Sequence, residues 1–165
     1  MDSRLLKELY QKYHRELYLY LYSLCKNREI TEDLLQETFL RACLSLSENH
    51  TNMRAWLYMV ARNLFLNLTK KEKSKLDIEQ LRDVSAEDAD VPQQIIEQER
   101  TRLLYEALQC LDRMKREVLV MQYFGSLSQK EIAAVLRLSP ENVRVLSFRG
   151  KREIRKIMEA SGYDI

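Results

Sequence analysis

Glycine and proline are scarce in this sequence, which has three glycines and two prolines among its 165 residues. Turns between β-strands depend heavily on these two residue types, so the composition disfavours an all-β fold. The residues that dominate instead include Leu, Glu, Lys, Arg and Gln, which are good helix formers. Because 45% of the residues are hydrophobic, the chain can also build packed cores. We expect an all-α protein.

Signals for disulfides, metals and catalysis are missing as well. Cys25, Cys43 and Cys110 are far apart, odd in number and outside any Cys-x-x-Cys or His-flanked pattern, so buried free thiols are expected. The two histidines, His14 and His50, lie in unrelated contexts, and no Gly-rich phosphate-binding loop is present. We expect neither a cofactor nor an enzyme.

Long apolar runs are also absent. No uninterrupted apolar stretch approaches the roughly 20 residues that span a bilayer. The N-terminus, MDSRLLKELY, lacks the basic start and apolar core of a signal peptide. These features predict a cytoplasmic protein with no membrane insertion of its own.

Charge is distributed unevenly along the chain, although the net charge is only +2. Residues 1–76 carry a net charge of +4, residues 77–111 carry −6 and residues 112–165 carry +4. Two basic parts therefore flank an acidic middle.

The acidic middle marks a domain boundary. The stretch LDIEQLRDVSAEDADVPQQ, residues 76–94, loses helical periodicity and contains Pro92, which disfavours helix at the residue before it. We predict two small helical domains, 1–76 and 94–165, joined by an acidic linker over residues 77–93.

Three helices are predicted in the first domain. The first covers about 24 residues: LYLYLY at 17–22 alternates like a strand, but apolar spacings of three and four around it favour a helix. Thr31 is predicted to cap the second, whose buried stripe is Leu35, Phe39, Ala42 and Leu46. The third covers about residues 53–73. Its inward residues are predicted to be Leu57, Val60, Ala61, Leu64 and Leu68, and its outward or edge residues Tyr58, Arg62, Asn63 and Phe65.

The second domain is predicted to begin with helices over about 94–111 and 113–123, the latter ended by Gly125 in a left-handed cap. A capping box, Ser128 to Glu131, then precedes a short apolar helix.

A second cap follows one tight turn later. Ser139 is predicted to cap a longer helix whose first residue is Pro140. That helix is predicted to bury Val143 and Leu146. It is predicted to expose Arg144, Ser147, Arg149, Lys151, Arg152, Arg155 and Lys156. A helical hairpin with a solvated charged face is one interpretation, but the paired caps, turn length and basic excess favour a DNA-binding helix-turn-helix.

Taken together, the segments EDLLQETFLRA (32–42), NMRAWLYMVARNLFLNLTKKEK (52–73) and LSQKEIAAVLRLSPENVRVLSFRGKREI (127–154) resemble a known family. In this order, around an acidic linker, they resemble a sigma-70 factor of the extracytoplasmic-function (ECF) type over about residues 5–158. The resemblance implies an alternative sigma factor that binds core RNA polymerase and directs promoter recognition, DNA melting and transcription initiation. A helix-turn-helix regulator that acts without polymerase is the alternative.

The resemblance implies a polymerase-docking role for three residues that match the family's D-x-x-Q-E pattern: Asp33, Gln36 and Glu37. At spacings of three and four they share one helix face and can accept hydrogen bonds from basic side chains. From the residues alone, an ordinary solvated face is the alternative.

The helix WLYMVARN resembles the segment that reads the minus-10 element as single-stranded DNA. Asn63 matches the family asparagine that contacts a flipped base, and an amide suits this role because it both donates and accepts hydrogen bonds. Further minus-10 candidates are Tyr58, Arg62, Lys70 and Lys71. For Trp56, a core position is favoured over base stacking.

The helix-turn-helix supplies the candidates for the minus-35 element. They are Glu141, Asn142, Arg144, Ser147, Phe148 and Arg149. Arg144 is expected at base edges and Arg149 at phosphate. Core RNA polymerase and promoter DNA are the implied partners, and many relatives are also held by an anti-sigma factor.

The chain departs from the family pattern at two places. The loop before the minus-10 helix has Glu48, Asn49 and His50 where some relatives place an aromatic residue. Val145 and Leu146 follow Arg144 where relatives often have a second cation. Both departures leave the base preference open. The acidic linker is expected either to enter a basic channel of polymerase or to serve as a solvated tether.

Overall fold

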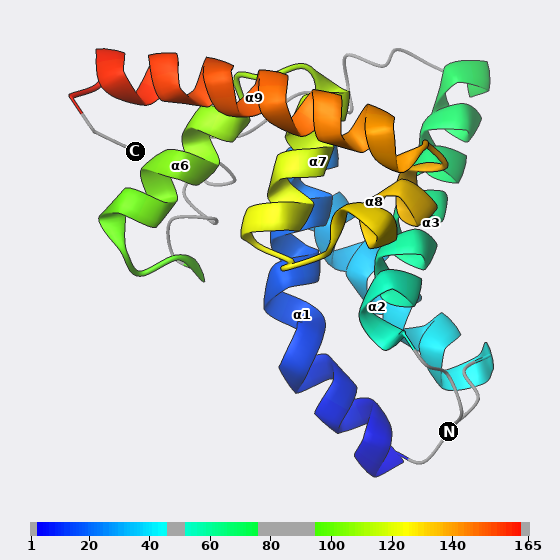
Figure 1. Cartoon of the computed structure of the whole chain (residues 1–165). Helices are drawn as coiled ribbons and strands as arrows, with labels where there is room; N and C mark the ends of the chain where they lie inside the picture. Colours follow the sequence, from blue (N-terminus) through cyan, green and yellow to red (C-terminus); the bar gives the residue numbers. More distant parts are fainter. Residues whose placement is uncertain (1–2, 46–51, 76–94, 163–165) are drawn as a thin grey trace. The chain divides into compact units, whose positions relative to one another are not determined.

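The computed structural model describes residues 3–45, 52–75 and 95–162 (Figure 1). The described residues form seven α-helices and no strand, which confirms the all-α prediction. The chain divides into two compact units, Met1–Ala89 and Asp90–Ile165. The predicted linker, 77–93, lies outside the described residues. No helix within the described ranges combines the length and apolarity needed to cross a bilayer.

The first unit contains α1 (Ser3–Cys25), α2 (Arg28–Ser45) and α3 (Met53–Lys75), which pack against one another. The LYLYLY stretch is helical, as predicted, and all six of its residues are buried. A helix enclosed on all sides loses the apolar periodicity of a surface helix. Because α1 contacts both α2 and α3, this stretch is apolar on every side of the helix. Its sequence therefore lacks helical periodicity and, taken alone, also resembles an alternating strand.

The start of α2 differs from the prediction. Asn27, not Thr31, lies at the helix start: its Oδ1 accepts a hydrogen bond from the Ile30 N–H at 3.0 Å. Thr31 is buried within the helix, and its hydroxyl donates to the Asn27 carbonyl at 2.7 Å. Asparagine and threonine side chains can both accept hydrogen bonds from the free backbone N–H groups of a helix start, and α2 begins after Asn27, the earlier of the two residues. Of the predicted stripe, the residues Leu35, Phe39 and Ala42 are buried, and Leu46 lies outside the described residues.

The buried stripe of α3 is wider than predicted. Leu57 and Ala61 are buried as expected, but Tyr58 and Phe65, predicted outward or at the helix edge, are buried too. The ring of Tyr58 lies 5.1 Å from that of Tyr20 in α1. Because α3 contacts α1 and α2 together, a larger part of its circumference is covered than one apolar stripe predicts. Val60, Leu64 and Leu68 are half-buried.

The second unit contains α6 (Glu99–Leu108), α7 (Arg113–Tyr123), α8 (Gln129–Leu136) and α9 (Pro140–Ala160). In Figure 1, α9 runs across the other three helices, and it contacts each of them. The helix predicted over 94–111 is shorter in the structure. It ends at Leu108, whose carbonyl accepts from the Leu111 N–H at 3.2 Å to form a tight turn.

The turn after α7 also differs in detail from the prediction. Gly125 was expected to adopt a left-handed conformation, but Ser126 has the positive φ, 55°. The Leu127 N–H bonds to the Met121 carbonyl at 3.1 Å and closes the turn around Ser126. Gly125 itself is buried.

The caps of the helix-turn-helix are as predicted. Ser128 and Glu131 form the complete capping box of α8. Ser139 accepts from the Asn142 N–H at 3.2 Å, and Pro140 begins α9. Between the helices, Arg137 takes a left-handed conformation with φ 58°. Two capped helices joined by one tight turn therefore make a helix-turn-helix.

The cysteines are free, but the prediction that they are buried is wrong. Cys25 and Cys43 are half-buried, and Cys110 is exposed.

Gly150 lies where α9 approaches α7, and it is buried. A Cβ atom there would lie 2.8 Å from Cδ1 of Leu119, which is fully buried. Gly150→Leu is therefore expected to lower the free energy of unfolding by about 1–3 kcal/mol, because added atoms must displace a packed core. Urea unfolding followed by circular dichroism measures the change. Ala160→Leu, at the exposed end of the same helix, is the control, and equal effects of both variants would refute the close-packing argument.

Candidate functional site

One exposed face of α2 carries the predicted polymerase-docking residues. Asp33 and Gln36 are exposed, and Glu37 is half-buried with its carboxylate 3.3 Å from the Arg41 Nε. Leu40 and Leu44 continue the face at the next two helical turns and are 51% and 77% exposed. The face therefore combines acidic, amide and apolar groups.

The two leucines were not among the sequence candidates. In an amphipathic helix, leucine is usually interpreted as core. Their spacing could have identified them as exposed. Leu40 lies seven residues, or about two helical turns, after Asp33 and therefore on the same face, off the buried stripe of Leu35, Phe39 and Ala42.

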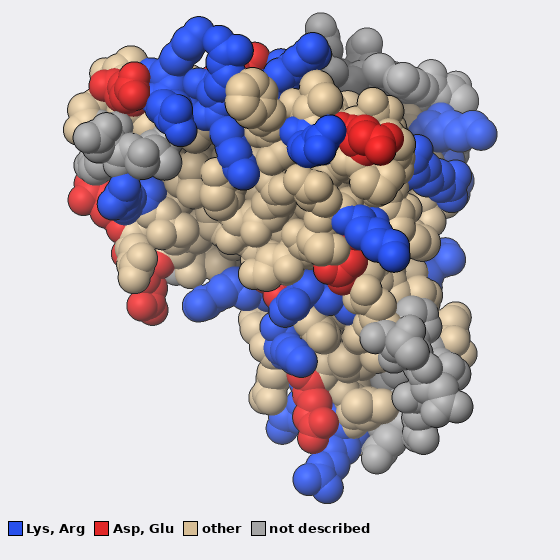
Figure 2. All heavy atoms as spheres, in the orientation of Figure 1, with Lys and Arg blue, Asp and Glu red and all other residues tan. Residues whose placement is uncertain are grey.

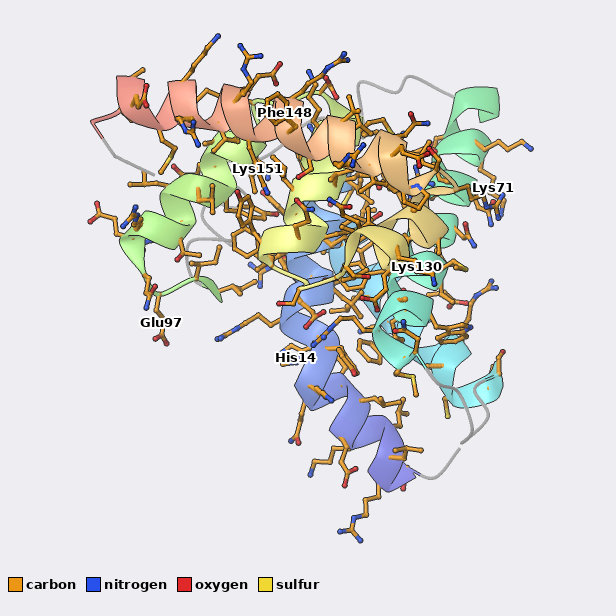
Figure 3. All side chains as sticks on the ribbon, viewed as in Figure 1. His14, Lys71, Glu97, Lys130, Phe148 and Lys151 are labelled. Atoms are coloured by element: carbon orange, nitrogen blue, oxygen red, sulfur yellow. The ribbon has the colours of Figure 1, made fainter. Side chains whose placement is uncertain are left out.

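A groove of about 750 Å³ lies between α2 and α3. The residues that line it are Leu34, Glu37, Arg41, Leu64, Asn67, Leu68, Lys70 and Lys71. Lys71, one of these lining residues, projects from α3 in Figure 3. The groove thus joins one polymerase candidate, Glu37, to two minus-10 candidates, Lys70 and Lys71. Its three cations and one paired carboxylate favour an anionic ligand such as a phosphate backbone.

The other minus-10 candidates on α3 divide into accessible and inaccessible residues. Asn63 and Arg62 are half-buried, so part of each side chain remains accessible. Tyr58 is fully buried, and the prediction that it faces outward toward DNA is wrong. Trp56 is half-buried, which places it at the edge of the core.

A group of residues that the sequence analysis missed connects α1 to the start of α3. The Arg54 Nε lies 3.0 Å from the Glu16 carboxylate, and the Arg54 guanidinium lies 5.3 Å from the centre of the Tyr13 ring. Burial raises the pKa of Glu16 above 4.5, while Arg54 opposes the rise. Burial and then the negative charge of Glu16 raise the pKa of Tyr58 well above 10.0. This group holds the first turn of α3 against α1 and so orients the helix that carries Asn63.

Arg54→Ala is expected to lower the free energy of unfolding by about 1–3 kcal/mol at pH 7, because Glu16 stays half-buried and ionised without its partner. Arg54 lowers the Glu16 pKa, so its removal raises that pKa further. As the pH falls from 7 toward 4.5, Glu16 becomes protonated in the folded variant and the loss should shrink.

Urea titrations of wild type and variant at several pH values measure this dependence. The control is Arg4→Ala, which breaks an exposed pair with Glu8 and should cost under about 1 kcal/mol. A loss for Arg54→Ala that stays constant with pH would contradict the role given to Glu16.

The outward face of α9 carries most of the minus-35 candidates. Glu141, Asn142, Arg144, Phe148 and Arg149 are exposed. Figure 2 shows Lys and Arg side chains gathered over this helix. The exposed cations of α9 are Arg144, Arg149, Lys151, Arg152, Arg155 and Lys156.

Ser147 is the exception among these candidates. It is buried, and its hydroxyl donates to the Gln122 Oε1 in α7 at 2.8 Å. The prediction that it is exposed for DNA contact is wrong, because Ser147 lies four residues after Val143 and shares its buried stripe. Its hydrogen bond instead holds α9 against α7.

Comparison with known proteins identifies both units. The family model for Sigma-70 region 2 matches residues 9–75, and the model for Sigma-70, region 4 matches residues 101–154. The ECF RNA polymerase sigma factor SigM of Bacillus subtilis (strain 168) is 30% identical over 151 residues, which cover 91% of this chain and 93% of SigM. The chain belongs to the ECF type of the sigma-70 family. In this sigma factor, region 2 therefore spans most of α1–α3, and region 4 covers the helix-turn-helix.

Further relatives agree with this assignment. The ECF RNA polymerase sigma factor SigX of B. subtilis (strain 168) is 29% identical over 163 residues, covering 92% of this chain and 82% of SigX. The sigma factor RpoE from Bartonella quintana, solved in complex with the anti-sigma factor NepR, matches with a TM-score of 0.72 at 21% identity. That match covers 93% of this chain and 98% of RpoE. CnrH, solved in complex with the cytosolic domain of CnrY, matches with a TM-score of 0.68 at 23% identity, covering 96% of this chain and 90% of CnrH. These two structures share its fold.

Proposed function

We propose that this sigma factor binds core RNA polymerase through α2 and brings it to promoters that α3 and α9 recognise. The observation that carries the proposal is the presence of two dissimilar exposed faces: a mixed acidic and apolar face on region 2 and a cationic face on region 4. One suits a protein partner and the other suits DNA. The factor would act in the cytoplasm as an initiation factor rather than an enzyme.

The polymerase-docking face consists of Asp33, Gln36, Glu37, Leu40 and Leu44. Asp33 and Glu37 supply carboxylates for charge-assisted hydrogen bonds, which are stronger than neutral ones. Full burial of a leucine side chain is worth about 1.5–3 kcal/mol. The face therefore fits a polymerase helix that presents basic residues toward Asp33 and apolar residues toward Leu44.

Minus-10 recognition is assigned to Asn63, Arg62, Lys70 and Lys71. Asn63 is positioned to pair with the edge of an extruded base, because its amide offers one acceptor and two donors. Lys70 and Lys71 are exposed along the groove between α2 and α3, where they can neutralise phosphates of the same strand.

Minus-35 recognition is assigned to the first half of α9. The N-terminal residues of a recognition helix face base edges in the major groove, which places Glu141, Asn142 and Arg144 there. Phe148 and Arg149 lie about one helical turn further on, where Arg149 can reach phosphate. Once polymerase holds both regions, each DNA contact raises the effective concentration of the other.

The solved complexes of RpoE and CnrH suggest one further partner. RpoE is bound by the anti-sigma factor NepR, and CnrH by the cytosolic domain of CnrY. We extend this mode of control to the present chain: an anti-sigma factor that covers the α2 or α9 face would block the proposed contacts.

Run-off transcription tests the proposed function. Purified core polymerase and fragmented chromosomal DNA of the host would be incubated with and without the protein. Discrete transcripts that need the protein are expected, and their aligned start sites would define the promoter. If none form while the protein alone retards specific fragments, a helix-turn-helix regulator that acts without polymerase replaces the proposal.

A further inference from the structure

An exposed apolar residue lies at the centre of the DNA-facing side of α9. The buried residues of the helix are Val143, Ser147, Gly150, Ile154 and Met158. At about 100° per residue, Val145 lies about 200° around the axis from Val143, so it points directly away from the core. Its exposed fraction is 41%. Among the residues of this unit that the structure describes, Val145 is not part of the buried core.

Val145 has an apolar neighbour on the same face. Phe148, three residues later, is 63% exposed and is labelled on α9 in Figure 3. Residues three apart on a helix lie next to each other. The Arg152 guanidinium lies 5.9 Å from the centre of the Phe148 ring and so borders this apolar pair. Val145 and Phe148 together form an apolar strip about one helical turn long.

Cations border the strip. Arg144, Arg149 and Arg152 are all exposed, and they make the surroundings suitable for a phosphate backbone rather than for an apolar protein. With Arg149 and Arg152 at the phosphates and Arg144 at a base edge, Val145 would face the floor of the major groove. The one apolar group that base edges present there is the 5-methyl group of thymine.

We propose that Val145, bordered by Phe148, contacts the 5-methyl group of a thymine in the minus-35 element and so helps to determine promoter specificity. The inference rests on the proposed role of α9 in reading that element. Val145 can neither donate nor accept a hydrogen bond, so it selects through apolar contact alone. A·T pairs at this position are therefore preferred over G·C pairs.

The test exchanges thymidine for deoxyuridine, which lacks only the 5-methyl group. Holoenzyme assembled from core polymerase and the full chain would first select its minus-35 element from a randomised promoter library. Each thymine of that element is then replaced singly by uracil, and holoenzyme affinity is measured. Loss of the critical methyl group should weaken binding of the wild-type holoenzyme about threefold to fourfold.

The Val145→Ser holoenzyme should bind the thymine and uracil promoters equally at that position. Ala160→Ser, a matched change at the exposed end of α9, should keep the wild-type preference. Three results would each overturn the inference. The wild-type holoenzyme could bind the thymine and uracil promoters equally, or Val145→Ser could keep the preference for thymine over uracil. The third result is a selected minus-35 element without A·T pairs. If the holoenzyme initiates no transcript on any DNA, the proposed function itself fails.

Discussion

Asp33→Lys is expected to weaken assembly of this sigma factor with core polymerase by about tenfold to a hundredfold, or about 1.4–2.8 kcal/mol. The side chain is exposed at the start of the docking face, so the change should leave the fold intact. A lysine there would repel the basic partner groups that the carboxylate attracts, and like charges across an interface are costly. Titration of labelled sigma factor with core polymerase, followed by fluorescence anisotropy, measures the effect.

Glu8→Lys is the matched control for this measurement. It makes the same change in net charge at an exposed acidic residue that belongs to α1 and is not part of the docking face of α2. Its affinity for polymerase should stay within about twofold of wild type, because the exposed ion pair of Glu8 with Arg4 contributes little. If both variants bind equally well, α2 does not dock as proposed. If both lose affinity equally, only the overall charge matters.

Arg144→Ala is expected to reduce open-complex formation on the cognate promoter by about tenfold to a hundredfold. A bidentate contact between arginine and a base edge contributes about 1–3 kcal/mol of discrimination, and the alanine variant loses it. On a promoter whose minus-35 element has been scrambled, the same substitution should have little effect. Permanganate footprinting of the melted strand on both templates measures the ratio.

Lys156→Ala serves as the control for Arg144→Ala. It removes one exposed positive charge from the C-terminal half of α9, where a phosphate contact is the expected role. Its effect should be similar on both promoters and should shrink with added salt. If Arg144→Ala reduces open-complex formation similarly on both templates, Arg144 does not read a base. Its role would then be general electrostatic attraction to DNA.

Local signals explain which parts of the fold could be predicted. The two caps of the helix-turn-helix depend on side chains that bond to backbone within three residues, as Ser128 and Ser139 do. The bounds of α7, Arg113–Tyr123, agree with the predicted range 113–123, although Gly125 does not form the predicted cap. Where two local solutions compete, the sequence alone was insufficient: Asn27 begins α2 in place of Thr31, and Ser126 takes the left-handed conformation expected of Gly125.

Errors about the candidate site have a different cause. Tyr58 and Ser147 are polar, and both were expected to face outward toward DNA, yet both are buried. Whether such a residue is buried depends on how many other helices pack against its own helix. The apolar periodicity of one helix does not give that number. Leu40 and Leu44 are the opposite case, since they are apolar, were not among the predicted site residues, and remain exposed on α2.

The sequence by itself determined the helical class, the helix-turn-helix and the family resemblance, because these depend on composition, short-range caps and the order of motifs. The tertiary structure decided which faces remain exposed for partners. It also brought together Glu16 and Arg54, which are 38 residues apart, and placed Gly150 against Leu119. Such contacts form only when separate helices pack, so their energies depend on distances that no local pattern encodes.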